Sequence, residues 1–269
     1  MKKAILILSL FAFISCKEKE PVPTPVTTPT CNISSETGRD NAYRLDYVYA
    51  ANGLPEGVNI SVKDNATGQL KATGKALYTY DNNRLVKVVD GDVEETIVYN
   101  ANGSISKLVV TKTPEANYLN YTLNFTTDAK QRITKVTDSK GLEATITRDT
   151  QGNILETVTK DTRTNQEVFK VVLSGYDNKK SMFEAYKGWQ FSVLGYYAEY
   201  IKFPLYTTQA GGNATKRTEY ESGKAVRETT YTYTYSTEGF PLTEQTLTRF
   251  LDGSGISTYS KTFTYTDCK

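Results

Sequence analysis

The chain has 269 residues and a nearly balanced charge, with 32 lysines and arginines against 30 aspartates and glutamates. This balance gives no basic field that would attract nucleic acid, so we expect no nucleic-acid partner. Histidine is absent, which excludes Ser-His and Cys-His nucleophile pairs and histidine-ligated zinc, and we expect neither a metal nor another cofactor.

The N-terminus has the features of an export signal. Two lysines precede an apolar run over residues 4–14, which is too short to span a bilayer. The run ends in Phe13-Ile14-Ser15-Cys16, a pattern that resembles a lipobox. We therefore expect residues 1–15 to be a lipoprotein signal peptide and Cys16 to carry the lipid. The alternative is an ordinary secretory signal followed by a chance cysteine.

Residues 16–38 are expected to form a tether that is rich in proline and threonine. Pro21 to Thr30 alternates proline with β-branched residues, a composition that favours polyproline II and forms no core. Acyl chains on Cys16 would make the membrane a partner. The charged residues after Cys16 resemble the surface-export signal of Bacteroidota lipoproteins. We predict an outer-membrane lipoprotein on the cell surface, with the periplasmic face as the alternative.

Two further cysteines lie near the two ends of the remaining chain. Cys31 precedes the expected domain and Cys268 is the penultimate residue. In an oxidising compartment such a pair forms a disulfide when its Cα atoms come within about 7 Å. We predict this bond, with two free thiols as the alternative.

Residues 39–269 are predicted to form one repeat β domain. Each repeat has an aromatic-x-aromatic segment, a short turn containing Asp, Asn or Gly, and a second strand with an aliphatic and often a basic residue. The clearest copies are Leu77–Val88, Ile97–Leu108 and Leu123–Val136.

Each copy is typical of a β-hairpin. In Tyr231-Thr-Tyr-Thr-Tyr235 the aromatic and hydroxyl residues alternate, which places them on opposite faces of a strand. Turns such as Asn102-Gly103 supply the positive φ that a tight hairpin needs. Ile133 and Val136 have a spacing of three, which predicts a β-bulge or burial of both faces.

Successive hairpins of this kind form an antiparallel meander. We count about fifteen strands, more than an open twisted sheet holds without curling. The predicted fold class is mainly β: a single twisted, curled antiparallel meander that wraps into a superhelix or an incomplete barrel, with one short helical insertion.

The repeat resembles the YD-type repeats of RHS proteins, and more closely a family of Bacteroidota lipoproteins of unknown function built from such hairpins. The resemblance covers roughly residues 40–267 and includes Tyr176-Asp-Asn-Lys-Lys-Ser-Met-Phe183 and Asn213-Ala-Thr-Lys216. It implies an architecture and no particular activity.

An aromatic insertion at about residues 181–206 interrupts the repeat and contains the only tryptophan. One interpretation is a platform on which sugar rings stack; the other is a helical plug that covers the concave face of the sheet. We favour the plug. The candidate ligand-binding residues are Tyr186, Trp189, Tyr196, Tyr197 and Tyr200.

Other patterns give weaker hypotheses. Asp90-Gly-Asp92 with Glu94 and Glu95 offers oxygen atoms to calcium, although a turn flanked by solvated acids is the simpler interpretation. Ser104 and Lys107 match the Ser-x-x-Lys spacing of acylases, but on a strand they would face opposite sides. No residue is singled out as catalytic.

We therefore predict a non-enzymatic, membrane-anchored binding module for glycans or another envelope component. One alternative is a structural or assembly partner of an outer-membrane complex. The other is a glycan hydrolase that uses two carboxylates, because thirty acids are present and their spatial separation cannot be read from the sequence.

Overall fold

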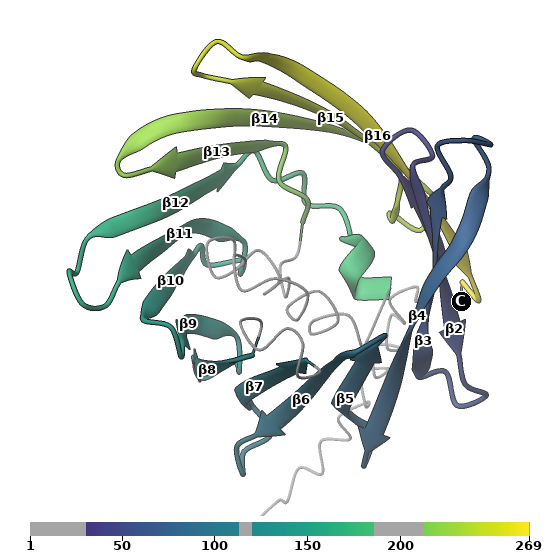
Figure 1. Ribbon diagram of the computed structural model, residues 1–269, viewed down its shortest axis with the longest axis horizontal. Helices are drawn as coiled ribbons and strands as arrows, with labels where there is room; N and C mark the ends of the chain where they lie inside the picture. The colour runs from purple at the N-terminus through teal and green to yellow at the C-terminus, as the bar shows by residue number, and fades with distance from the viewer. Residues whose placement is uncertain (1–30, 113–119, 186–211, 269) are drawn as a thin grey trace, which may run out of the picture.

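The computed structural model of the chain describes residues 31–112, 120–185 and 212–268. In these ranges sixteen strands, paired in chain order, form one closed antiparallel barrel (Figure 1). The strands are β1 Asn32–Gly38, β2 Tyr43–Tyr49, β3 Pro55–Lys63, β4 Leu70–Asp81, β5 Arg84–Asp90, β6 Val93–Tyr99, β7 Ile105–Lys112, β8 Tyr121–Thr127, β9 Ile133–Asp138, β10 Leu142–Arg148, β11 Ile154–Asp161, β12 Glu167–Ser174, β13 Lys216–Glu221, β14 Lys224–Tyr235, β15 Pro241–Phe250 and β16 Gly255–Thr266.

The barrel is closed, which corrects the expected superhelix or incomplete barrel. Strand β1 pairs with β2 on one side and with β16 on the other, and its Ile33 is opposite Tyr265. The prediction of a mainly β, antiparallel fold is confirmed. Residues 32–38 form β1, so the first strand lies within the segment expected to be tether.

Side chains alternate between the interior and the exterior, as the repeat predicted. In β8, Tyr121, Leu123 and Phe125 are buried in the barrel, whereas Asn124 and Thr126 are exposed on the outside. The same holds in β14, where Thr232 and Thr234 are exposed and the tyrosines between them are partly buried. The apolar core therefore lines the inside of the ring.

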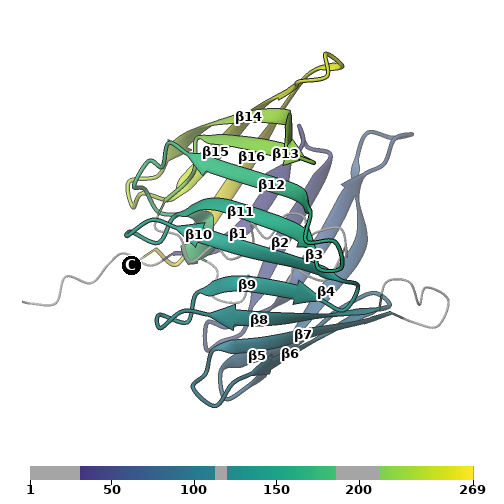
Figure 2. The same cartoon turned by 90° about the vertical axis from the view of Figure 1, so that its left-hand side faces the viewer.

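The turns lie at two ends of the barrel (Figure 2). We call the end with the turns that follow β2, β4, β6, β8, β10, β12 and β14 the disulfide end, because the Cys31–Cys268 bond lies there. The other is the opposite end. Gly103, Gly152 and Gly239, at the disulfide end, have φ values of 85°, 100° and 87°, which confirms the predicted tight turns.

A β-bulge recurs where the second strand of a hairpin begins. Opposite Thr126 and Thr127, the partners are Lys135 and Ile133, so Thr134 is skipped. The bulge lets Ile133 and Val136 both point inward, at 9% and 3% exposure. The predicted bulge is confirmed.

Tyrosine hydroxyls connect neighbouring hairpins at the disulfide end. The backbone pairing of β5 with β6 covers only Lys87–Asp90, at the opposite end. Where the pairing stops, the hydroxyl of Tyr99 donates a 2.8 Å hydrogen bond to the carbonyl of Leu85. Equivalent bonds join Tyr49 to Ile33, Tyr176 to Ile154 and Tyr265 to Pro241.

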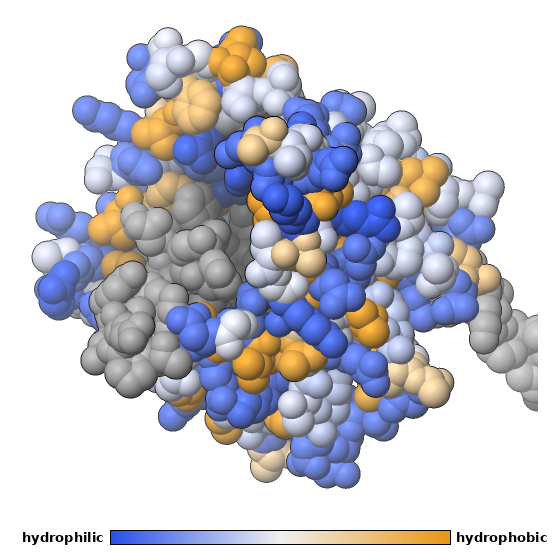
Figure 3. All heavy atoms as spheres, turned by 45° about the vertical axis from the view of Figure 1, so that its right-hand side comes forward, coloured by the Kyte–Doolittle hydropathy of each residue, from blue (hydrophilic) through white to orange (hydrophobic). Residues whose placement is uncertain are grey.

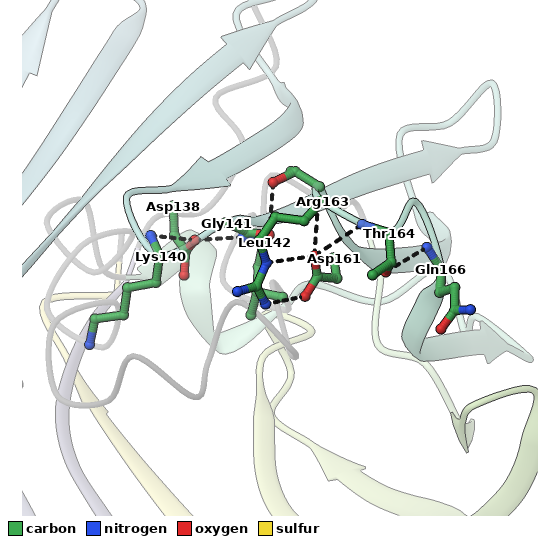
Figure 4. Close-up of polar contacts among 9 residues, drawn as sticks. Asp138, Lys140, Gly141, Leu142, Asp161, Arg163, Thr164 and Gln166 are labelled. Carbon is green, nitrogen blue, oxygen red and sulfur yellow. Dashed lines mark hydrogen bonds and ion pairs between the residues drawn. The ribbon is translucent and has the colours of Figure 1, made fainter.

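Aspartates shape the turns of both ends, and Figure 4 shows two at the opposite end. The Asp138 carboxylate accepts hydrogen bonds from the backbone N–H groups of Lys140 and Leu142 at 2.9 and 2.7 Å. Asp161 accepts in the same way from Arg163 at 2.8 Å. Such Asx turns fix the chain reversal without a long loop.

The described part of the predicted insertion is a single 3₁₀ turn, η2 Met182–Ala185, which lies inside the ring of strands (Figure 1). Met182 and Ala185 are buried in the hydrophobic core, and η2 contacts β1. Within the described ranges no helix is both long enough and apolar enough to cross a membrane.

Candidate functional site

A polar pocket of about 540 Å³ lies inside the barrel toward the opposite end. Strands β13 to β16 and the turn between β1 and β2 form its walls, and these elements are neighbours in the ring. Its volume falls within the range of small-molecule sites. Its charged lining residues are Arg39, Asp40, Arg217 and Arg227.

A buried carboxylate holds two of these arginines in place. Glu219 of β13 faces inward, and its side chain is only 4% exposed. One of its oxygens is 2.8 Å from Nη2 of Arg217, and the other is 3.0 Å from Nη1 of Arg227. Because each oxygen has its own guanidinium, the carboxylate is paired and the two cations are fixed side by side.

Aromatic rings and hydroxyls complete the wall. Tyr231, Tyr259 and Phe250 line the pocket, and the guanidinium of Arg227 lies 5.2 Å from the centre of the Phe250 ring. Burial raises the pKa of Tyr231, whose hydroxyl is hydrogen-bonded to Arg217. The pocket thus combines cations, hydroxyl groups and ring faces, which suits a hydroxylated ligand.

A second buried polar cluster lies beside this pocket and crosses the β1–β16 seam. Lys261 of β16 has its Nζ 3.7 Å from Glu36 of β1 and 3.8 Å from Glu244 of β15. Tyr43 donates a 2.5 Å hydrogen bond to Glu36, and burial together with that carboxylate raises the pKa of Tyr43. Burial alone would lower the pKa of Lys261, but Glu244 and Glu36 outweigh it and raise this pKa.

Glu36 and Glu244 are two carboxylates near one another, since each lies within 4 Å of the same ammonium group, and a carboxylate pair is what glycosidases use. Hydrolysis requires one carboxyl group as a proton donor to the glycosidic oxygen. Here Lys261 lies between the two, which gives both an ion pair. The arrangement is that of a structural ion cluster.

The structure places the predicted site residues as follows. Cys31 and Cys268 form a disulfide with their Cα atoms 4.1 Å apart, which confirms the predicted bond. Cys16 and the candidate ligand-binding residues lie outside the described residues; the latter are Tyr186, Trp189, Tyr196, Tyr197 and Tyr200.

The two glutamates of the acidic cluster proposed for calcium lie on opposite faces of β6. Glu95 points into the barrel and is 4% exposed, whereas Glu94 forms a 2.6 Å ion pair with Lys87. In the described part of the chain, one group of candidate metal-binding atoms comes from Cys31, Cys268 and Glu238. Its two sulfurs are bonded to each other and offer no thiolate.

The sequence analysis missed Arg217, Glu219 and Arg227. The alternation of inward and outward positions along the strands could have pointed to them. These charged residues occupy inward positions of β13 and β14, where other repeats carry aliphatic or aromatic residues. The segment from Thr218 to Glu228 matches the repeat only weakly, so its pattern did not mark Glu219 as an inward residue. In the structure Glu219 is buried instead.

Comparison with known proteins identifies the fold. No family model matches the chain, and no curated protein matches it. A porin-like protein from Bacteroides uniformis, known from its crystal structure, has a TM-score of 0.59 at 16% identity over 90% of this chain and 100% of its own. A porin-like protein from Bacteroides vulgatus gives 0.36 at 10% identity over 87% and 99%. The chain therefore shares its barrel architecture with the first of these structures.

Proposed function

We propose that this protein is a non-enzymatic binding lipoprotein of the bacterial envelope, anchored through Cys16 and similar to lipoproteins built from YD-type repeats. Its ligand is a glycan or another envelope component, bound in the pocket at the opposite end of the barrel. The tether attaches at residue 31, at the disulfide end. The pocket lies at the other end of the barrel from residue 31.

The observation that carries the proposal is the polarity of the outer face. A barrel that spans a bilayer presents an apolar band to lipid and alternates apolar-out with polar-in. Here the order is reversed, with Leu123 and Phe125 inside and Asn124 and Thr126 outside. On the face shown in Figure 3, apolar residues are scattered among hydrophilic ones. This outer face supports a barrel that lies in water and is attached to the membrane through a lipid on Cys16.

Fractionation of cells that carry the Cys16→Ser variant tests this proposal. We expect the wild-type protein to sediment with membranes and to incorporate a labelled fatty acid, and the variant to be unlabelled and recovered in the soluble fraction. A Cys16→Ser protein that folds yet stays in washed membranes would show that the barrel itself is embedded. Protease added to intact cells would then separate surface display from the periplasmic face.

Ligand binding is tested with the intrinsic fluorescence of Trp189, the only tryptophan, or by calorimetry against a panel of polysaccharides. We expect saturable binding without release of reducing ends. Release of reducing ends that is lost in Glu244→Gln would instead favour the hydrolase. Cross-linking to one stoichiometric protein, with no retained sugar, would favour an assembly role.

A further inference from the structure

The charges of the pocket restrict the ligand more closely than its shape does. Three arginines, Arg39, Arg217 and Arg227, line it, and Asp40 is the acid beside them. The charged side chains that line the pocket, taken with Glu219 behind its wall, sum to one positive charge. The two acids of the neighbouring cluster, Glu36 and Glu244, face Lys261 instead. The arginines of the lining therefore favour an anionic group on the ligand over a neutral one.

Asp40 is already engaged elsewhere. Its Oδ1 atom accepts hydrogen bonds from the hydroxyl of Ser260 at 2.9 Å and from the backbone N–H of Ser260 at 3.2 Å. These bonds tie the β1–β2 turn to β16. Asp40 therefore acts as part of the seam and leaves the arginines available to a ligand.

Arg227 has hydrogen-bonding capacity to spare. A guanidinium has five N–H donors, and Nη1 of Arg227 is directed at Glu219. Its Nε atom is buried and has no hydrogen-bond partner among the described residues, while its side chain is 40% exposed. The donors that an acceptor on a ligand would meet are the other guanidinium N–H groups of this partly exposed side chain.

We propose that the ligand is an acidic saccharide, whose anionic group binds at Arg227 and Arg39 while a sugar ring lies against Tyr231 and Tyr259. This inference rests on the proposed function, because it takes the pocket as the ligand site. The anionic group is a carboxylate, as in a uronic acid, or a sulfate ester. Arginine suits both, since its planar fork matches two oxygens of either group.

Calorimetry with matched oligosaccharides tests the inference. The probes are a tetrasaccharide of galacturonic acid, its methyl ester, a neutral galactose tetrasaccharide and a sulfated galactose tetrasaccharide. We expect an acidic probe to bind at least tenfold more tightly than the ester and the neutral sugar. The tighter of the two acidic probes identifies the anionic group. We also expect affinity for the acidic probe to fall as salt is raised.

Variants locate the binding site. Arg227→Gln and, on the exposed turn, Arg39→Gln should each weaken binding of the acidic probe about tenfold. Arg249→Gln removes the same charge from the exposed outer face of β15 and should leave affinity unchanged. Because Arg39 has no role in the core, its variant keeps the test valid if Arg227→Gln unfolds the barrel.

Two outcomes would overturn the inference, and they are distinguishable. If neutral and acidic probes bind equally, and Arg39→Gln and Arg227→Gln behave like Arg249→Gln, the acidic ligand is wrong although the protein still binds glycans. If none of the four probes and no member of the polysaccharide panel binds, both the acidic ligand and the proposed glycan-binding function are wrong.

Discussion

The hydroxyl of Tyr265 donates a 2.8 Å hydrogen bond to the backbone carbonyl of Pro241, beyond the point where the pairing of β15 with β16 ends at Thr243 and Thr262. The tyrosine of the repeat thus has two roles. Its ring contributes to the core, and its hydroxyl satisfies a carbonyl that the diverging strands leave unpaired. This accounts for tyrosine rather than phenylalanine at that position.

Removing one of these hydroxyls should lower stability without changing the fold. We expect Tyr176→Phe, which loses the bond to Ile154, to reduce the free energy of unfolding by about 1 kcal/mol. Urea denaturation followed by circular dichroism measures the change. Tyr220→Phe is the matched control, because that residue faces outward beside Lys170. Equal effects of the two variants would contradict a specific role for the inward hydroxyl.

The disulfide should stabilise the barrel by restricting the unfolded chain. Cys31 and Cys268 are 237 positions apart, so their bond closes nearly the whole described domain into a loop. We expect Cys31→Ser with Cys268→Ser to reduce the free energy of unfolding by about 2–5 kcal/mol. A reductant should shift the urea midpoint of the wild type toward that of the double variant. It should have no effect on the double variant itself.

Glu95 should make stability depend on pH. Burial, with Asp90 nearby, raises its pKa to about 8, against about 4.3 in an unfolded chain. Between these two pKa values the folded state keeps the proton while the unfolded state loses it, so the free energy of unfolding falls as pH rises. Above about pH 8 Glu95 causes no further change. Below about pH 4 both states are protonated, and Glu95 has no effect on stability.

Glu95→Gln removes that titration. We expect the variant to match the wild type near pH 4 and to exceed its stability by more than about 1 kcal/mol at pH 8. Denaturation curves collected across this range give the comparison. Glu94→Gln on the outer face controls for the loss of one acid. A constant difference between Glu95→Gln and wild type at every pH would show that Glu95 is ionised in the barrel.

Lys261 should be essential to the seam. In Lys261→Met the buried carboxylates of Glu36 and Glu244 lose their shared cation, and we expect a loss of about 3 kcal/mol. Lys160→Met removes an exposed lysine from β11 and should change stability by less than about 0.5 kcal/mol. Thermal unfolding by calorimetry compares the two. A variant in which Glu36 and Glu244 are also replaced by glutamine should recover part of the loss.

Local features of the fold were readable from the sequence, whereas its closure was not. The alternation at Tyr231–Tyr235, the turn at Gly103 and the bulge at Ile133 each follow from a few neighbouring residues. Strand β1 reads Asn-Ile-Ser-Ser-Glu-Thr-Gly and lacks the aromatic pattern. It is a strand because β2 and β16 pair with it, and the second of these partners lies more than 200 positions away.

The site was harder to predict for the same reason. Arg217 and Arg227 belong to adjacent strands, and Arg39 joins them only because closure brings the β1–β2 turn beside β16. An isolated arginine in a strand is typical of a solvated face. Glu219 shows the difference, since a carboxylate that is buried between two arginines can be recognised only in three dimensions.

The bond between Cys31 and Cys268 joins the beginning of β1 to the end of β16. The arrangement of the strands in the barrel therefore does not depend on which strand comes first in the chain. With its two ends 4.1 Å apart, the domain is nearly a ring, and its backbone can in principle be opened elsewhere and rejoined here. A circular permutant that begins at Gly223, in the short turn after β13, would keep all sixteen pairings of adjacent strands. The junction between Cys31 and Cys268 is thus one of several places at which the ring of strands could be opened.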